Sequence, residues 1–156
     1  MKKRILIVED DKRIQQYLAR AMEGNSYELV WTQTAHAALN RLLDEDFDLL
    51  LLHIDRSDMD EWKALAGFNA LHPFRPLVML ADRPDPFQCT RMFGADAVLE
   101  KPFDQTRLLQ TVRQLLDESH QARRSRLVRS LCGWLRMSDP QPAFSTRGYE
   151  KNDSAR

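Results

Sequence analysis

Five short apolar runs, separated by amphipathic stretches, constrain the fold of this chain more than any other feature of its sequence. We expect these runs to be strands, at Arg4–Val8, Tyr27–Trp31, Asp48–Ile54, Leu77–Leu80 and Ala97–Leu99. Nearly continuous apolar character is typical of parallel strands that are buried on both faces. Helical patterns follow the runs, at residues 11–23, 34–43, 61–71, 84–94 and 104–117. This strict alternation predicts an α/β fold with helices on both faces of a parallel sheet.

Composition narrows the class of protein. No apolar run approaches the roughly 18–20 residues that a membrane-spanning helix needs, so no span is expected. The basic start of the chain is followed only by Ile5–Val8 before three acids, which does not fit an export signal. Cys89 and Cys132 lie far apart without metal-ligand spacing. The chain is therefore expected to be cytoplasmic.

Charge is unevenly distributed although the formal net charge is zero. Residues 1–117 hold 15 Lys and Arg against 19 Asp and Glu, whereas residues 118–156 hold 8 against 4. An acidic body with a basic C-terminal segment does not favour nucleic acid as the main partner.

Ionisable side chains gather where the predicted strands end. Glu9 and Asp10 follow the first strand, His53 and Asp55 lie at the end of the third, and Lys101 follows the fifth. Ligands of open parallel sheets bind beyond the carboxyl ends of the strands. Adjacent carboxylates facing a lysine suit a small hard cation and a phosphoryl group. The alternative is that each acid is only a solvated loop residue.

Three segments carry a resemblance to a known family: ILIVEDD, FDLLLLHID and GADAVLEKPF. In order and spacing they resemble the receiver domain of bacterial response regulators, over about residues 3–118. The resemblance implies a flavodoxin-like, doubly wound sheet of five parallel strands in the order 2-1-3-4-5. We therefore expect a receiver-like domain over residues 1–119.

The resemblance also implies roles for single residues. Glu9 and Asp10 match the acidic pair that helps to hold Mg²⁺, and Asp55 matches a loop position near that site. Lys101 matches the lysine that contacts the phosphoryl oxygens, and its bond to Pro102 is expected to be cis.

Three positions depart from the family pattern. His53 stands at the phosphoacceptor aspartate, Ala81 at the switch Thr or Ser, and Val98 at the switch aromatic residue. Without an aspartate nucleophile and with an imidazole in place of a carboxylate, the remnant site of Glu9, Asp10 and Asp55 should bind Mg²⁺ weakly or not at all. We also expect Lys101 to pair with Asp10 or a neighbouring carboxylate.

These departures predict a degenerate pseudo-receiver that is not an enzyme and needs no cofactor. It would act in two-component signalling or a phosphorelay by binding a protein, such as a histidine kinase or a transcription regulator. One alternative is an unusual receiver that is phosphorylated at Asp55 or His53. A more distant alternative is a metal-dependent enzyme with a mixed carboxylate–imidazole site.

The C-terminal segment predicts a basic amphipathic helix over residues 120–137 and a disordered tail over residues 138–156. Five apolar residues form one stripe of this helix: Leu127, Val128, Leu131, Trp134 and Leu135. We expect the stripe to pack on the receiver domain, on a second copy in a homodimer or on a protein partner. An anionic membrane surface and nucleic acid remain alternatives for the arginines around it.

Overall fold

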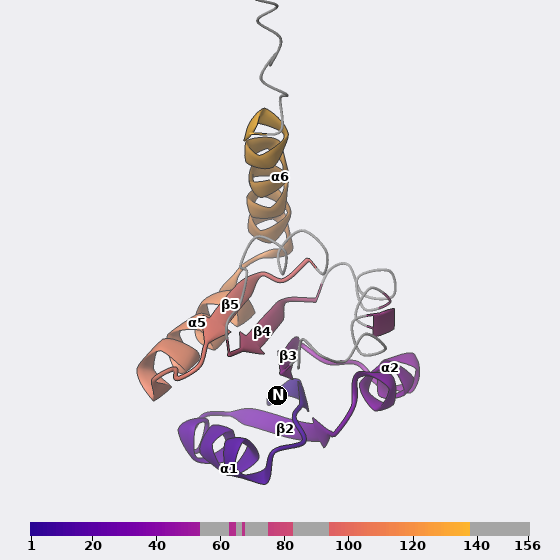
Figure 1. The fold of residues 1–156 in the computed structure, drawn as a ribbon, viewed down its shortest axis with the longest axis vertical. Coiled ribbons are helices and arrows are strands. Elements are labelled where there is room, and N and C mark those ends of the chain that lie inside the picture. The colour runs from indigo at the N-terminus through magenta and orange to yellow at the C-terminus, as the bar shows by residue number, and fades with distance from the viewer. Residues whose placement is uncertain (54–62, 65–66, 68–74, 83–93, 138–156) are drawn as a thin grey trace, which may run out of the picture. The chain divides into compact units, whose positions relative to one another are not determined.

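A computed structural model describes residues 1–53, 63–64, 67, 75–82 and 94–137, with the side chains of 130–137 left out (Figure 1). Its elements are β1 Lys3–Val8, α1 Lys12–Ala21, β2 Tyr27–Thr32, α2 Ala35–Asp44, β3 Leu49–His53, β4 Leu77–Ala81, β5 Ala97–Glu100, α5 Gln105–Asp117 and α6 His120–Met137. The helices expected over 61–71 and 84–94 lie almost entirely outside the described residues, as does the expected disordered tail. Within the first, Lys63, Ala64 and Gly67 are helical.

The five strands form one parallel sheet in the order β2-β1-β3-β4-β5. This confirms the predicted flavodoxin-like α/β fold with an added C-terminal helix. Each predicted strand is found within one or two residues of its expected bounds, because the apolar runs that predicted the strands are the segments buried in the sheet.

The two faces of the sheet are covered by different helices, as Figure 1 shows. Alternate side chains of β3 point to opposite faces, so Leu50 and Leu52 join one apolar cluster and Leu49 and Leu51 the other. The first cluster includes α2, and the second includes α1 and α5. The middle strands are therefore buried on both sides, which explains why their sequences are almost wholly apolar.

Side-chain caps define where α1, α2 and α5 begin. Asp11, Thr34 and Asp104 each accept a hydrogen bond from the backbone N–H two or three residues later. Thr34 and Asp104 cap the helices that were predicted to begin there. Asp11, which was expected inside a helix, is instead the N-cap of α1.

Contacts divide the chain into two units, Met1–His120 and Gln121–Arg156. The sheet, α1, α2 and α5 belong to the first unit, and nearly all of α6 belongs to the second. Among the residues that the structure describes, no helix combines the length and the apolar character needed to cross a bilayer.

A polar network holds the amino ends of β1 and β3. The guanidinium of Arg4 lies 2.6 Å from Glu45 Oε2 and 4.7 Å from the centre of the Phe47 ring. Asp48, just before β3, accepts hydrogen bonds from the backbone N–H of Arg4 at 2.8 Å and from Lys3 Nζ at 3.2 Å. Burial opposes ionisation of Asp48, but these two donors outweigh it and hold its pKa below the ordinary value.

This network predicts how stability depends on pH. Because the pKa of Asp48 is lower in the folded chain than in the unfolded chain, its contribution is present above about pH 4 and is lost as pH falls through the folded pKa. Asp48→Asn should lower the free energy of unfolding by about 1 kcal/mol at pH 7 and by less at acid pH. Urea denaturation at several pH values measures both effects. The matched control is Asp44→Asn, an exposed acid at the end of α2, and an equal loss in both variants would contradict the prediction.

Candidate functional site

Strand register brings three ionisable side chains to the carboxyl edge of the sheet. Val8 of β1 pairs with Leu52 of β3, so Glu9 and His53 come next on neighbouring strands. His53 is the last residue of β3. The strand was predicted to end one residue later, at Ile54, which lies outside the described residues. Ala81 pairs with Glu100 across β4 and β5, which places Lys101 directly after this edge.

Glu9 is a fully buried carboxylate, with a side chain that is 0% exposed. Its Oε1 accepts hydrogen bonds from the backbone N–H of Asp11 at 2.9 Å and lies 3.0 Å from His53 Nδ1. Its Oε2 is buried and has no hydrogen-bond partner among the described residues. A buried carboxylate normally has hydrogen-bond donors on both oxygens, and in the described part of the chain only one oxygen of Glu9 has them.

His53 lies between Glu9 and Lys101. Its Nδ1 faces Glu9 Oε1 at 3.0 Å, and its Nε2 lies 2.9 Å from Lys101 Nζ. An ammonium group has only donors, so Nε2 accepts and the ring proton is assigned to Nδ1, which donates to Glu9. The imidazole is therefore neutral and connects the carboxylate of β1 to the lysine that follows β5.

Lys101 contacts an imidazole in addition to a carboxylate. Its Nζ is 2.9 Å from His53 Nε2 but 4.0 Å from Asp82 Oδ1, and no pair with Asp10 is found among the described residues. The expected pairing with a neighbouring carboxylate is thus found with Asp82, at the outer limit of an ion pair, whereas the shorter contact with His53 was not predicted. The Lys101–Pro102 bond is cis, as expected.

The acids described at this edge, Glu9 and Asp10, do not by themselves offer the site that Mg²⁺ prefers. Asp10 is exposed, and its carboxylate comes within 4.8 Å of the ligand atoms of Glu9 and His53. Asp55 lies outside the described residues. Mg²⁺ favours octahedral oxygen ligands, whereas His53 supplies nitrogen and already contacts the Lys101 ammonium. The described residues therefore fit Mg²⁺ poorly.

The two other departures from the family pattern lie in the sheet. Ala81 is the last residue of β4, is buried, and accepts a hydrogen bond from the Lys101 backbone N–H at 2.9 Å. Its side chain offers no hydroxyl. Val98 of β5 is partly buried and packs on the apolar cluster that includes Met79.

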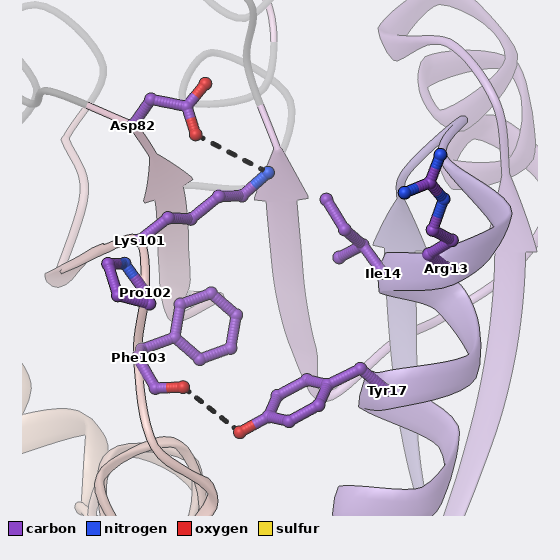
Figure 2. Close-up of a pocket in the computed structure, with 7 residues that line it drawn as sticks. All are labelled: Arg13, Ile14, Tyr17, Asp82, Lys101, Pro102 and Phe103. Carbon is purple, nitrogen blue, oxygen red and sulfur yellow. Dashed lines mark hydrogen bonds and ion pairs between the residues drawn. The ribbon is translucent and has the colours of Figure 1, made fainter.

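A pocket of about 490 Å³ lies beside Lys101 (Figure 2). Side chains of α1 form one wall, and the segments that follow β4 and β5 form the other. The lining residues are Arg13, Ile14, Tyr17, Asp82, Lys101, Pro102 and Phe103. Tyr17 joins the two walls, since its hydroxyl donates to the Phe103 carbonyl at 3.0 Å and the two rings meet edge to face. Tyr17 was not singled out from the sequence.

Two further residues that support the site were not singled out from the sequence. Asp11 caps α1 and thereby aims its own N–H at Glu9. Gln15 donates from its side chain to the Glu9 carbonyl at 2.6 Å. An Asp before an amphipathic stretch is a cap signal that could have identified Asp11. Nothing in the sequence distinguishes Gln15 from any other polar helix residue.

The predicted partner-binding stripe belongs to α6. In the described part of this helix Leu127 is half-buried and Val128 is 50% exposed. The side chains of Leu131, Trp134 and Leu135 lie outside the described residues.

The two contacts of the His53 ring, with Glu9 and with Lys101, should contribute measurably to stability. His53→Leu removes one donor from the buried Glu9 carboxylate and the acceptor of Lys101, so the free energy of unfolding should fall by about 1–3 kcal/mol. Denaturation in urea at pH 7 tests this. His36→Leu, at an exposed position of α2, should change it by less than about 0.5 kcal/mol. A His53→Leu variant as stable as the parent would show that the bridge contributes nothing.

Comparison with known proteins agrees with the fold. The family model that describes the response regulator receiver domain matches residues 5–113 of this chain. The transcriptional activator protein IrlR of Burkholderia pseudomallei is 30% identical over 128 residues, which cover 81% of this chain and 55% of that protein. The transcriptional regulatory protein CpxR of Escherichia coli is 31% identical over 124 residues, covering 75% and 50%. The chain thus spans about half the length of these curated relatives.

Solved structures give the same result. A CheY-like response regulator receiver domain from Methanospirillum hungatei is 30% identical, with a TM-score of 0.67 over 75% of this chain and 95% of that one. The signal receiver domain of an HD domain-containing protein from Pseudomonas fluorescens is 26% identical, also with a TM-score of 0.67, over 75% and 96%. With its 2-1-3-4-5 sheet and the acidic and lysine positions at one edge, this chain belongs to the response regulator receiver domain family of two-component signalling.

Proposed function

We propose that this receiver domain is degenerate and works as a phosphorylation-independent module that binds another protein in the cytoplasm. One observation carries the proposal: His53 ends β3 with both ring nitrogens engaged, one by Glu9 and the other by Lys101. The residues that would serve a cation and a phosphoryl group are thus joined to each other. The module is not an enzyme in this proposal.

The chemistry at His53 supports this reading. An aspartate oxygen can attack phosphorus as an anion, with a metal ion offsetting charge on the incoming group. The neutral imidazole has its one lone pair, on Nε2, directed at Lys101. Phosphorylation at His53 would require the contact between Nε2 and Lys101 Nζ to break. The other alternative acceptor, Asp55, lies outside the described part of the chain.

The switch positions support it as well. A two-state element responds to a phosphoryl group only through contacts that differ between its states. Ala81 has no hydroxyl to donate to a phosphoryl oxygen, and Val98 is already packed on the core at the position of the switch aromatic residue. Neither side chain supplies such a contact.

Partner binding is assigned to α6 in this proposal. The stripe of Leu127, Val128, Leu131, Trp134 and Leu135 would dock on a protein or on a second copy of the chain. The curated relatives are transcriptional regulators and an activator, which favours a histidine kinase or a transcription regulator as partner. Nucleic acid and a membrane surface are the less favoured occupants.

Labelling with a phosphodonor tests the missing acceptor. Incubation of the full chain with acetyl phosphate and Mg²⁺ should leave its intact mass unchanged, because no anionic nucleophile stands at the end of β3. A receiver that carries an aspartate there, treated in parallel, is the positive control. Gain of one phosphoryl group at His53 or Asp55 would make this chain a working receiver of unusual design.

Restoring the aspartate separates cation binding from switching. His53→Asp should strengthen Mg²⁺ binding by about tenfold or more, since a carboxylate replaces a nitrogen ligand. It should not restore a phosphodonor-dependent change in self-association, because Ala81 and Val98 remain. Isothermal titration and sedimentation velocity give the two readouts. A full response in both would show that His53 alone had disabled the domain.

The role of α6 is tested by Trp134→Ala combined with Leu131→Ala. Burying two such side chains contributes roughly 1.5–3 kcal/mol each, so self-association or partner binding should weaken about tenfold or more. Residues 1–119 should still unfold cooperatively. Gln121→Ala with Ser125→Ala, two exposed polar positions on the same helix, is the control. Unchanged association after the apolar double substitution would remove α6 from the proposed interface.

A further inference from the structure

One imidazole and two carboxylates come together at the carboxyl edge of the sheet. Ligand atoms of Glu9, Asp10 and His53 all lie within 4.8 Å of one another. We propose that this cluster is a site for a borderline transition-metal cation such as Zn²⁺ or Co²⁺, and that it selects such a cation over Mg²⁺. The inference concerns these residues alone and does not depend on the proposed function.

The buried oxygen of Glu9 points independently to a missing ligand. The Glu9 side chain is 0% exposed, and its Oε2 has no hydrogen-bond partner among the described residues. Its other oxygen already accepts from the Asp11 N–H and from His53. Leaving a buried carboxylate oxygen without a partner is unfavourable, and a bound cation would satisfy it.

The nitrogen of His53 decides the class of cation. Imidazole and carboxylate together form common ligand sets for Zn²⁺, which accepts three protein ligands and leaves a fourth position open to water. Mg²⁺ binds oxygen in strict octahedral geometry and loses its water reluctantly. Replacing a carboxylate by His53 therefore lowers the affinity for Mg²⁺ and raises it for zinc-like cations.

Lys101 competes with the cation for His53. A cation bound to Nδ1 requires the ring proton to sit on Nε2, where the Lys101 ammonium can no longer donate. Lys101 Nζ, now 2.9 Å from Nε2, would have to leave, and the Asp82 carboxylate at 4.0 Å is available to receive it. Cation binding and the Lys101–His53 contact thus exclude each other, which makes Lys101 a determinant of affinity without being a ligand.

Metal titrations of the full chain test the site. Isothermal titration with Zn²⁺, Co²⁺ and Mg²⁺ should give one site that binds Zn²⁺ and Co²⁺ at least about tenfold more tightly than Mg²⁺. His53→Asn should weaken Zn²⁺ binding about tenfold or more, because a ligand is lost. Lys101→Met should strengthen it several-fold, because the competing ammonium is gone. His36→Asn, on exposed α2, should leave it unchanged.

A measurement on the parent chain guards against a variant that fails to fold. Nitrogen-15 NMR of the histidine rings should show a Zn²⁺-dependent shift of His53 Nδ1 and none for His36. An unshifted His53 at saturating Zn²⁺, equal Zn²⁺ affinity in His53→Asn, or weaker binding in Lys101→Met would each overturn the proposal. None of these outcomes alters the phosphodonor result, because that experiment uses Mg²⁺ and reads mass.

Discussion

A sheet that is buried on both faces can carry ionisable side chains only at the ends of its strands. The residues Leu49–Leu52 of β3 and Leu77–Ala81 of β4 are all buried, so a charged group within either segment would lose its hydration without finding a partner. Parallel register then brings the carboxyl ends of the strands to one edge. The proximity of Glu9, His53 and Lys101 is a consequence of these two constraints.

At that edge, the nature of one side chain changes the electrostatics of the whole group. A carboxylate at the end of β3 would add a charge beside Glu9 and would need a cation between them. The imidazole of His53 instead donates to Glu9 through one nitrogen and accepts from Lys101 through the other. Repulsion between two carboxylates is thereby replaced by a chain of hydrogen bonds from Glu9 through His53 to Lys101.

Much of this arrangement follows from the sequence because its causes are local. The apolar runs predicted the strands, and Thr34 and Asp104 predicted two helix starts because a cap is read from neighbouring residues. The nearest partner of Lys101 could not be predicted in this way. It depends on the reach of the His53 ring across two strands, which is set by sheet register and rotamer.

Asp11 and Gln15 likewise differ in whether a local sequence pattern could reveal their roles. Asp11 lies in a readable cap motif, although its second role, presenting an N–H to Glu9, appears only when β1 and α1 are placed together. Gln15 reaches back to the Glu9 carbonyl from the first turns of α1, and many polar residues could occupy that position without such a contact. Supporting contacts of this kind depend on the angle between a strand and the following helix, which no local pattern records.

The bond between His53 and Lys101 is the most easily exchanged part of the edge. A neutral imidazole attracts an ammonium less strongly than a carboxylate does, because only a dipole and one lone pair face the charge. Glu9, by contrast, is wholly buried and is held by the backbone of Asp11, so it cannot leave without exposing the start of α1. Any ligand that enters this edge will therefore displace Lys101 first. The backbone after β5 is anchored separately, because the Lys101 N–H donates to the Ala81 carbonyl and the Tyr17 hydroxyl donates to the Phe103 carbonyl. The lysine side chain can therefore leave without the segment that carries it.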